Sequence, residues 1–95
     1  MTKIFNAQAR DLQRQLQRAI VGEADALYEL GVAYSSGREG MTIDLIEAHK
    51  WFNLAAMKGD RRAAEDRREL SAEMSKVEIA EAQREARAFL SRQAA

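Results

Sequence analysis

The sequence predicts an all-α protein that forms a single domain over residues 1–95. Its length of 95 residues fits one small domain. The chain contains no proline, the residue that disrupts helices most strongly, and eighteen of its residues are alanine, the best helix former. Residues that favour strands, such as valine, isoleucine and threonine, are few. These observations exclude a β-sandwich or a barrel and favour a short array of about five helices.

The first predicted helix covers about residues 3–21 and makes up the N-terminal segment 1–21. Gly22 follows it, and glycine readily adopts the left-handed conformation that ends many helices. Apolar side chains recur in this helix at spacings of three and four residues, the pattern of an amphipathic helix. They are Phe5, Ala9, Leu12, Leu16, Ala19 and Ile20.

Two further helices are predicted over about residues 23–36 and 44–58, joined by a loop at residues 37–42. Asp44 stands three residues before Glu47, which is the capping-box pattern at the start of a helix. The inward faces of both helices are expected to carry residues that recur with helical spacing. These residues are Ala24, Leu27, Leu30, Gly31, Tyr34, Leu45, Ala48, Trp51, Phe52, Ala55 and Ala56.

The last two helices are predicted over about residues 60–73 and 76–92. Ser75 and Glu78 form a second capping box, which begins the last helix. The loops between all these helices are short, so neighbouring helices are expected to run antiparallel. The expected inward residues of the last helix are Ile79, Ala82, Ala86, Phe89 and Leu90.

The segment 22–59 contains an ordered set of small, aromatic and turn-forming residues. In chain order they are Ala24 and Ala26, Leu30 and Gly31, Tyr34, Gly37 and Gly40, Asp44, Ala48, Trp51 and Phe52, Ala55 and Ala56, and Gly59. This set resembles the Sel-one-like repeat family, whose members have tetratricopeptide-like helical hairpins. The resemblance implies one full repeat at residues 22–59, flanked by capping helices in segments 1–21 and 60–95. Small residues at such positions let paired helices approach closely.

Charge and composition exclude several classes of function. Fifteen basic and fifteen acidic residues give a formal net charge of zero, so no overall charge steers the chain to nucleic acid or anionic lipid. There is no cysteine, and no stretch has the apolar length of a signal peptide or a membrane span. We therefore predict a cytoplasmic protein without a membrane partner.

No motif predicts catalysis, a metal site or a cofactor site. Phosphate loops, zinc-ligand spacings and calcium loops are all absent from the sequence. His49 is the single histidine, and its neighbour Glu47 lies on a different face of the helix. We interpret His49 as an exposed or half-buried structural residue, and Ser35 and Ser36 as polar residues at a helix end. The sequence thus predicts no enzyme, no catalytic residue, no metal and no cofactor.

One candidate partner-binding surface lies on the outward side of the helix predicted at residues 23–36. Tyr28, Val32 and Ser36 recur there at intervals of four residues. The resemblance places them in the concave groove that tetratricopeptide-like proteins use for binding, where an exposed tyrosine and valine suit a partner helix or strand. The alternative is that the first or the last helix covers them.

The arginines provide further candidates. Arg10, Arg14 and Arg18 form a stripe that could bind phosphates or an acidic partner, but a solvated helix face is the favoured interpretation because no aromatic residue lies within the stripe. Four arginines at residues 61–68 stand among five acidic residues within 60–73, often three or four positions apart. This pattern favours a solvated, ion-paired helix face over nucleic-acid binding.

The function that the sequence favours is a non-catalytic protein–protein interaction module or adaptor. It would bind another protein through the face that contains Tyr28 and Val32. The alternative is a regulator that binds nucleic acid or an acidic partner through the stripe of Arg10, Arg14 and Arg18, with nucleic acid the less favoured ligand. A third option is a self-assembling structural protein, in which a homodimer completes the thin core.

Overall fold

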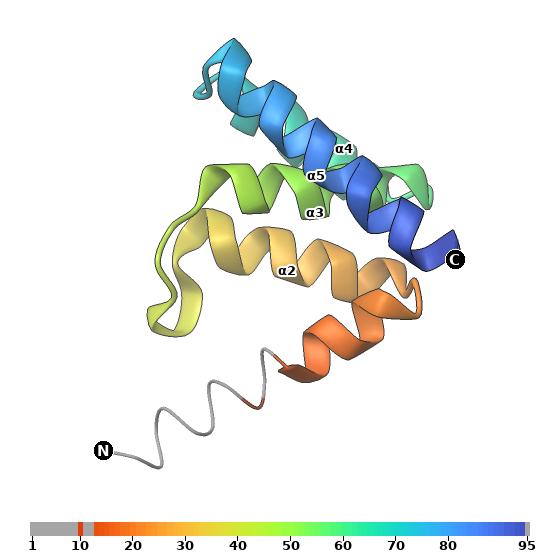
Figure 1. Ribbon diagram of the computed structural model, residues 1–95. Coiled ribbons are helices and arrows are strands. Elements are labelled where there is room, and N and C mark those ends of the chain that lie inside the picture. Colours follow the sequence, from red (N-terminus) through yellow and green to blue (C-terminus); the bar gives the residue numbers. More distant parts are fainter. Residues whose placement is uncertain (1–9, 11–12, 95) are drawn as a thin grey trace.

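A computed structural model describes residue 10 and residues 13–94, and this part of the chain is helical, without a strand (Figure 1). A helical segment at residues 13–20 precedes four helices and one 3-10 turn. These are α2 (Ala24–Ser36), η1 (Arg38–Gly40), α3 (Leu45–Met57), α4 (Arg61–Ser71) and α5 (Lys76–Ala94). The predicted all-α class is confirmed. The predictions for residues 3–9, 11 and 12, which include Phe5, Ala9 and Leu12, lie outside the described residues.

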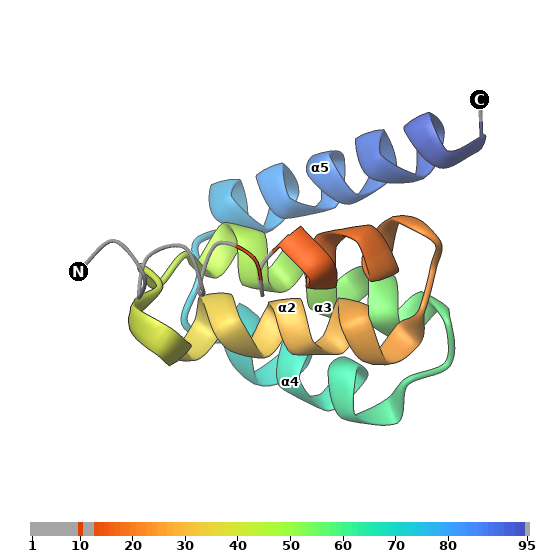
Figure 2. The same cartoon turned by 90° about the horizontal axis from the view of Figure 1, so that it is seen from below.

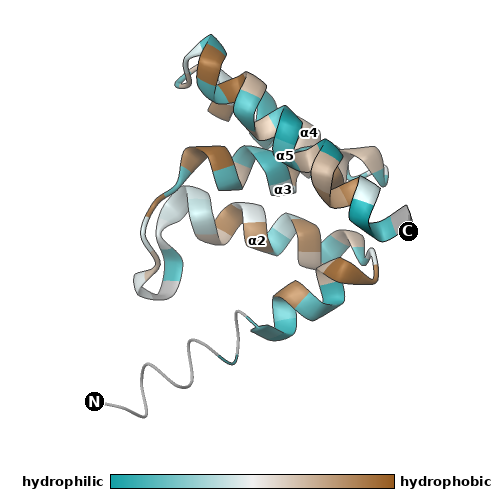
Figure 3. Cartoon of the chain, in the orientation of Figure 1, coloured by the Kyte–Doolittle hydropathy of each residue, from teal (hydrophilic) through white to brown (hydrophobic). Residues whose placement is uncertain are grey.

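The fold is centred on α3, which packs against α2, α4 and α5. Helices α2 and α3 lie side by side, and Figure 2 shows α4 and α5 on opposite sides of this pair. Apolar stretches alternate with hydrophilic ones along the helices (Figure 3), as expected for helices that bury one face. The arrangement leaves a second face of α2 beside α4.

Local hydrogen bonds define where the helices begin. Asp44 Oδ1 accepts a hydrogen bond from the amide of Glu47 at 3.1 Å, and Asp60 Oδ1 accepts from the amide of Arg62 at 2.9 Å. Before α5, the amide of Glu78 donates to Ser75 Oγ at 3.1 Å and the amide of Ser75 donates to the Glu78 carboxylate at 2.8 Å. The capping box predicted at residues 75–78 is therefore fully formed.

The capping box predicted at residues 44–47 is formed on one side only. The Glu47 carboxylate turns away from the start of α3 and accepts a hydrogen bond from Trp51 Nε1 at 2.9 Å. The amide of Asp44 instead donates to the carbonyl oxygen of Tyr34 at 2.9 Å. A tertiary contact between the end of α2 and the start of α3 thus replaces one of the two local bonds.

Aromatic contacts hold the core together around α3. The rings of Trp51 and Phe89 meet edge to face at 5.2 Å and join α3 to α5, and the rings of Tyr28 and Phe52 lie 5.6 Å apart and join α2 to α3. The buried residues of this core are Ala19, Ala26, Leu27, Leu30, Ala48, Trp51, Phe52, Leu54, Ala55, Ala63, Leu70, Ala86 and Phe89.

Two burial predictions are wrong. Leu90, expected to face inward, is 36% exposed, because the C-terminal turns of the 19-residue α5 diverge from the other helices (Figure 2). His49, expected to be exposed or half-buried, is only 2% exposed. Its burial follows from α4, which returns over this side of α3 and brings Ser71 within 3.0 Å of the imidazole.

Candidate functional site

A groove with a volume of about 380 Å³ lies between α2 and α4. Its apolar lining residues come from three helices: the half-buried Val32 on α2, and the buried Phe52 on α3 and Leu70 on α4. Tyr28 and Ser35 of α2 complete that side of the groove. The groove therefore combines apolar surface with a tyrosine, a composition typical of sites that anchor a partner side chain.

Acidic residues line the α4 side of this groove. Asp66, Glu69 and Glu73 all contribute to its lining. Asp66 and Glu69 lie three residues apart on α4, and Glu73 lies in the turn that follows the last residue of this helix, Ser71. The groove thus has an apolar base and a negatively charged wall.

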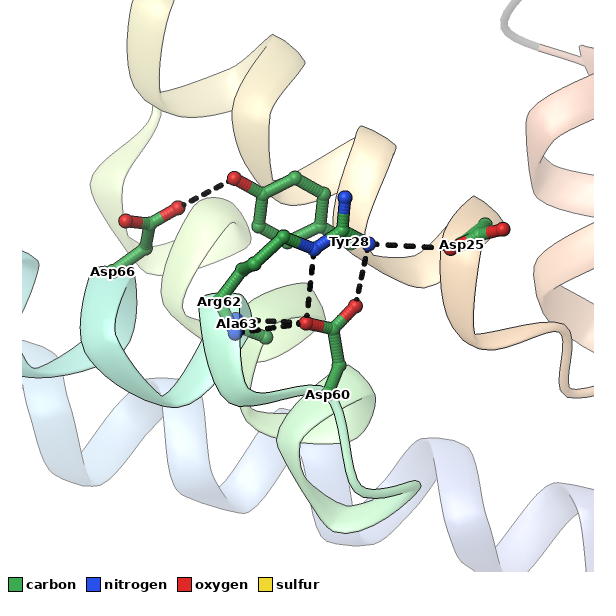
Figure 4. Close-up of polar contacts among 6 residues, drawn as sticks. All are labelled: Asp25, Tyr28, Asp60, Arg62, Ala63 and Asp66. Atoms are coloured by element: carbon green, nitrogen blue, oxygen red, sulfur yellow. Dashed lines mark hydrogen bonds and ion pairs between the residues drawn. The ribbon is translucent and has the colours of Figure 1, made fainter.

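Tyr28 is held in place from several sides (Figure 4). Its hydroxyl donates a hydrogen bond to Asp66 Oδ2 at 2.9 Å, and the guanidinium of Arg62 lies 4.2 Å from the centre of its ring. Burial, followed by the hydrogen bond to Asp66, raises the pKa of Tyr28 above its usual value. The phenol therefore stays protonated and keeps its bond to Asp66.

Arg62 connects the start of α4 to α2. Its guanidinium lies 2.8 Å from Asp60 and 3.2 Å from Asp25 (Figure 4). The hydrogen bond from Arg62 lowers the pKa of Asp60, although burial of that carboxyl opposes the shift. Because Asp60 also caps α4, these contacts align the groove wall with Tyr28 on α2.

The structure brings together two of the three residues predicted on the outward side of α2. Tyr28 and Val32 are half-buried and line the groove. Ser36 is exposed and lies outside the lining; its hydroxyl donates to the carbonyl oxygen of Val32 at 2.7 Å. Ser35, interpreted as a mere helix-end residue, lines the groove instead. The helix that packs beside this face is α4. The alternative considered from the sequence was that the first or the last helix covers it.

The prediction of an ion-paired face on residues 60–73 is correct in part. Arg62 pairs with Asp60, and Arg68 pairs with Glu65 at 3.8 Å. Arg67 instead donates to the side-chain oxygen of Asn53 on α3 at 2.6 Å. The acidic residues that line the groove were therefore assigned wrongly to an ion-paired surface. Their spacing along α4 was visible in the sequence, but nothing local shows that this side of α4 faces α2.

The three arginines of the predicted stripe are exposed. Arg18 Nε lies 2.6 Å from the carboxylate of Glu23. Arg10 and Arg14, together with Gln13 and Gln17, line a shallow surface hollow. Arg18 is thus paired within the chain.

His49 and Ser71 form a contact that the sequence analysis missed, because the two residues are 22 positions apart. The hydroxyl of Ser71 donates to the carbonyl oxygen of Arg67 at 2.8 Å, so the imidazole Nε2 at 3.0 Å acts as the donor to Ser71. A general base would need the opposite tautomer, and within the described residues Nδ1 has no partner to orient the ring. The pair is a structural hydrogen bond between α3 and α4.

A second surface feature is an apolar hollow of about 360 Å³ near the C-terminal ends of α3 and α5. Around it Val21 is 76% exposed and Met57 is 60% exposed. The turn between residues 13–20 and α2 contributes to this surface and shows apolar colour in Figure 3. This hollow is more apolar than the groove between α2 and α4.

Comparison of the chain with protein-family models found no matching family, and comparisons with curated proteins and with solved structures found no match either. Across residues 10 and 13–94, no helix combines the length and the apolar character that crossing a membrane requires. The same residues contain no group of three or more metal-ligating side chains. The function is therefore argued from the groove itself.

Proposed function

We propose that this protein is a non-catalytic interaction module that binds a partner protein in the groove between α2 and α4. The observation that carries the proposal is Tyr28, which lines the groove and is held by Asp66 and Arg62. A side chain that is already fixed loses little entropy on binding, and tyrosine is enriched among residues that dominate binding energy. The half-buried Val32 supplies apolar area beside it.

We also infer that residues 22–59 form a Sel-one-like repeat. The resemblance rests on the ordered residues of that segment, and α2 and α3 are the two helices that it would comprise. In tetratricopeptide-like proteins the first helix of each repeat lines the binding groove, and in this protein α2 lines the groove beside α4. The resemblance and the groove thus support the same surface from separate starting points.

Site-specific photo-crosslinking tests the proposed function. A photoreactive phenylalanine analogue at Ser35, in the groove, should give a discrete protein adduct in cells of the native host. The same analogue at Gln83, an exposed position on α5, is the matched control and should not. The adduct should disappear in a Val32→Asp background whose circular dichroism stays helical. Equal adducts at Ser35 and Gln83, or an adduct that survives Val32→Asp, would contradict the proposal.

Self-association is a second candidate, and the apolar hollow beside Val21 and Met57 favours it. Two copies that meet through this surface would cover exposed apolar area on both. Size-exclusion chromatography with light scattering over a range of concentrations measures this directly. A dimer that dissociates in a Val21→Ser/Met57→Ser variant would support self-association, and a monomer at all concentrations would contradict it. The arginine-stripe alternative gains no such support, since Arg18 is paired with Glu23.

A further inference from the structure

We propose that the partner segment that binds between α2 and α4 is basic and amphipathic. Its apolar side chain would contact Val32, above the buried Phe52 and Leu70, and its lysine or arginine side chains would pair with the carboxylates of Glu69 and Glu73. This inference rests on the proposed function of the groove and adds the chemistry of the partner.

The pairing pattern of the acidic side chains is the first argument. Among the acidic side chains that the structure describes, Glu69 and Glu73 are the two that neither pair with a cation nor accept a hydrogen bond. Both line the same groove, next to Asp66, whose carboxylate accepts from the Tyr28 hydroxyl. Carboxylates without a partner among the described residues thus lie at the site where a partner is proposed to bind.

The distribution of the arginines on α4 is the second argument. Arg67 and Arg68 adjoin Glu69 in the sequence, yet Arg67 bonds to Asn53 and Arg68 pairs with Glu65. None of the described residues that line the groove is a lysine or an arginine. Glu69, on α4, and Glu73, in the turn after it, therefore line the groove without a cation among the other lining residues. A cation from a partner would supply the missing counter-charge.

The contact between Tyr28 and Arg62 also favours a basic partner. The guanidinium of Arg62 lies over the Tyr28 ring at 4.2 Å, beside the groove (Figure 4). Aromatic and carboxylate groups at this site therefore already accommodate one guanidinium. The same surroundings disfavour an acidic peptide or a nucleic acid, because Asp66, Glu69 and Glu73 would repel phosphates and carboxylates.

Selection from a random-peptide phage library on the immobilised full chain tests this inference. Peptides that bind the parent chain but not the Val32→Asp variant report on the groove. We expect these peptides to be enriched in lysine or arginine within a few positions of a leucine or an aromatic residue. Their binding should weaken as the salt concentration rises, because exposed ion pairs are screened.

Charge variants of α4 provide the controls. Glu69→Gln/Glu73→Gln should weaken a selected basic peptide about fivefold, the effect of losing two exposed ion pairs, and Glu69→Lys/Glu73→Lys should weaken it further. Both glutamates are exposed, so these changes leave the core intact. Glu65→Lys, an exposed change on the same helix outside the groove, is the matched control and should retain binding.

Three results would overturn the inference. If the Val32-dependent peptides are not enriched in basic residues, or if the glutamate variants bind them as well as the parent chain does, the partner chemistry is wrong while a groove-binding partner still stands. If no Val32-dependent peptide is recovered, the inference also fails. The crosslinking experiment at Ser35 then tests the proposed function independently of the peptide selection.

Discussion

Gly31 on α2 packs directly against Phe52 on α3. A Cβ atom at this position would lie 2.4 Å from Cδ1 of Phe52, well inside van der Waals contact. Phe52 is fully buried and also contacts the Tyr28 ring, so it has little room to move. The absence of a side chain at Gly31 therefore permits the packing on which the groove depends.

Gly31→Ala should destabilise the protein. Alanine stabilises a helix by about 1 kcal/mol relative to glycine. Forcing a methyl group into a packed core, however, lowers the free energy of unfolding by about 1–3 kcal/mol. We expect the clash with Phe52 to dominate and the free energy of unfolding in urea to fall. Adding Phe52→Leu should recover part of this loss in a double-mutant cycle. A Gly31→Ala variant as stable as the parent chain would contradict the close contact.

His49 should make stability depend on pH. Burial, followed by the charge of Arg67, lowers the pKa of His49 below its usual value of about 6.5. The unfolded chain then binds a proton more readily than the folded one, so stability is complete above pH 6.5 and falls as the pH drops towards the folded pKa. In urea unfolding between about pH 8 and pH 5, His49→Gln should show a shallower decline than the parent chain. Parallel curves for the two proteins would contradict this assignment.

At the scale of helices, local capping explains why the element boundaries were predictable. Gly37 ends α2 with a φ of 70°, and Asp60 caps α4 through the amides of Arg62 and Ala63. Such interactions join residues no more than about four positions apart, so the sequence alone reveals them. The main departure is Glu47, which bonds to Trp51 instead of the amide of Asp44.

Ser75→Ala should remove the cap of α5. The Ser75 hydroxyl accepts the amide of Glu78, and loss of such a cap costs about 1 kcal/mol. We expect a lower melting temperature in a circular dichroism scan. Ser91→Ala, an exposed change near the other end of the same helix, serves as the control and should leave the melting temperature nearly unchanged. Equal effects of the two substitutions would show that the capping bond contributes nothing.

At the scale of the whole molecule, Trp51 attaches α5 to the rest of the fold. Its ring packs against Phe89, its Nε1 donates to Glu47, and the ammonium of Lys50 lies 4.5 Å from its ring centre. Helix α5 makes its principal contacts with α3. Trp51 therefore carries much of the interaction that holds the last nineteen helical residues in place.

Trp51→Ala should cost about 3–5 kcal/mol, the range for truncation of a buried aromatic residue. This is a large share of the 5–15 kcal/mol that stabilises a typical domain, so the variant should be largely unfolded or melt far below the parent chain. Trp51→Phe, which keeps an aromatic ring and loses the bond to Glu47, should lose less. An unchanged melting temperature for Trp51→Ala would place this residue outside the core.

The sequence predicted only the α2 side of the groove. Tyr28 and Val32 were identified because helical periodicity separates them from the buried face of α2. The contribution of α4 was missed, and Glu69 and Glu73 were assigned to an ion-paired surface. Periodicity describes the faces of one helix but does not say which helices pack together. Periodicity therefore could not predict that α4 packs beside α2.

The sequence by itself determined the all-α class, the positions of the helices and most of the core, because these follow from propensity, capping and periodicity over a few neighbouring residues. The tertiary structure alone decided that His49 is buried, that Leu90 is exposed and that Glu69 faces a groove. Each of these features depends on how α4 and α5 pack on opposite sides of α2 and α3. Such packing is set by contacts between residues distant in the chain, which local patterns do not encode.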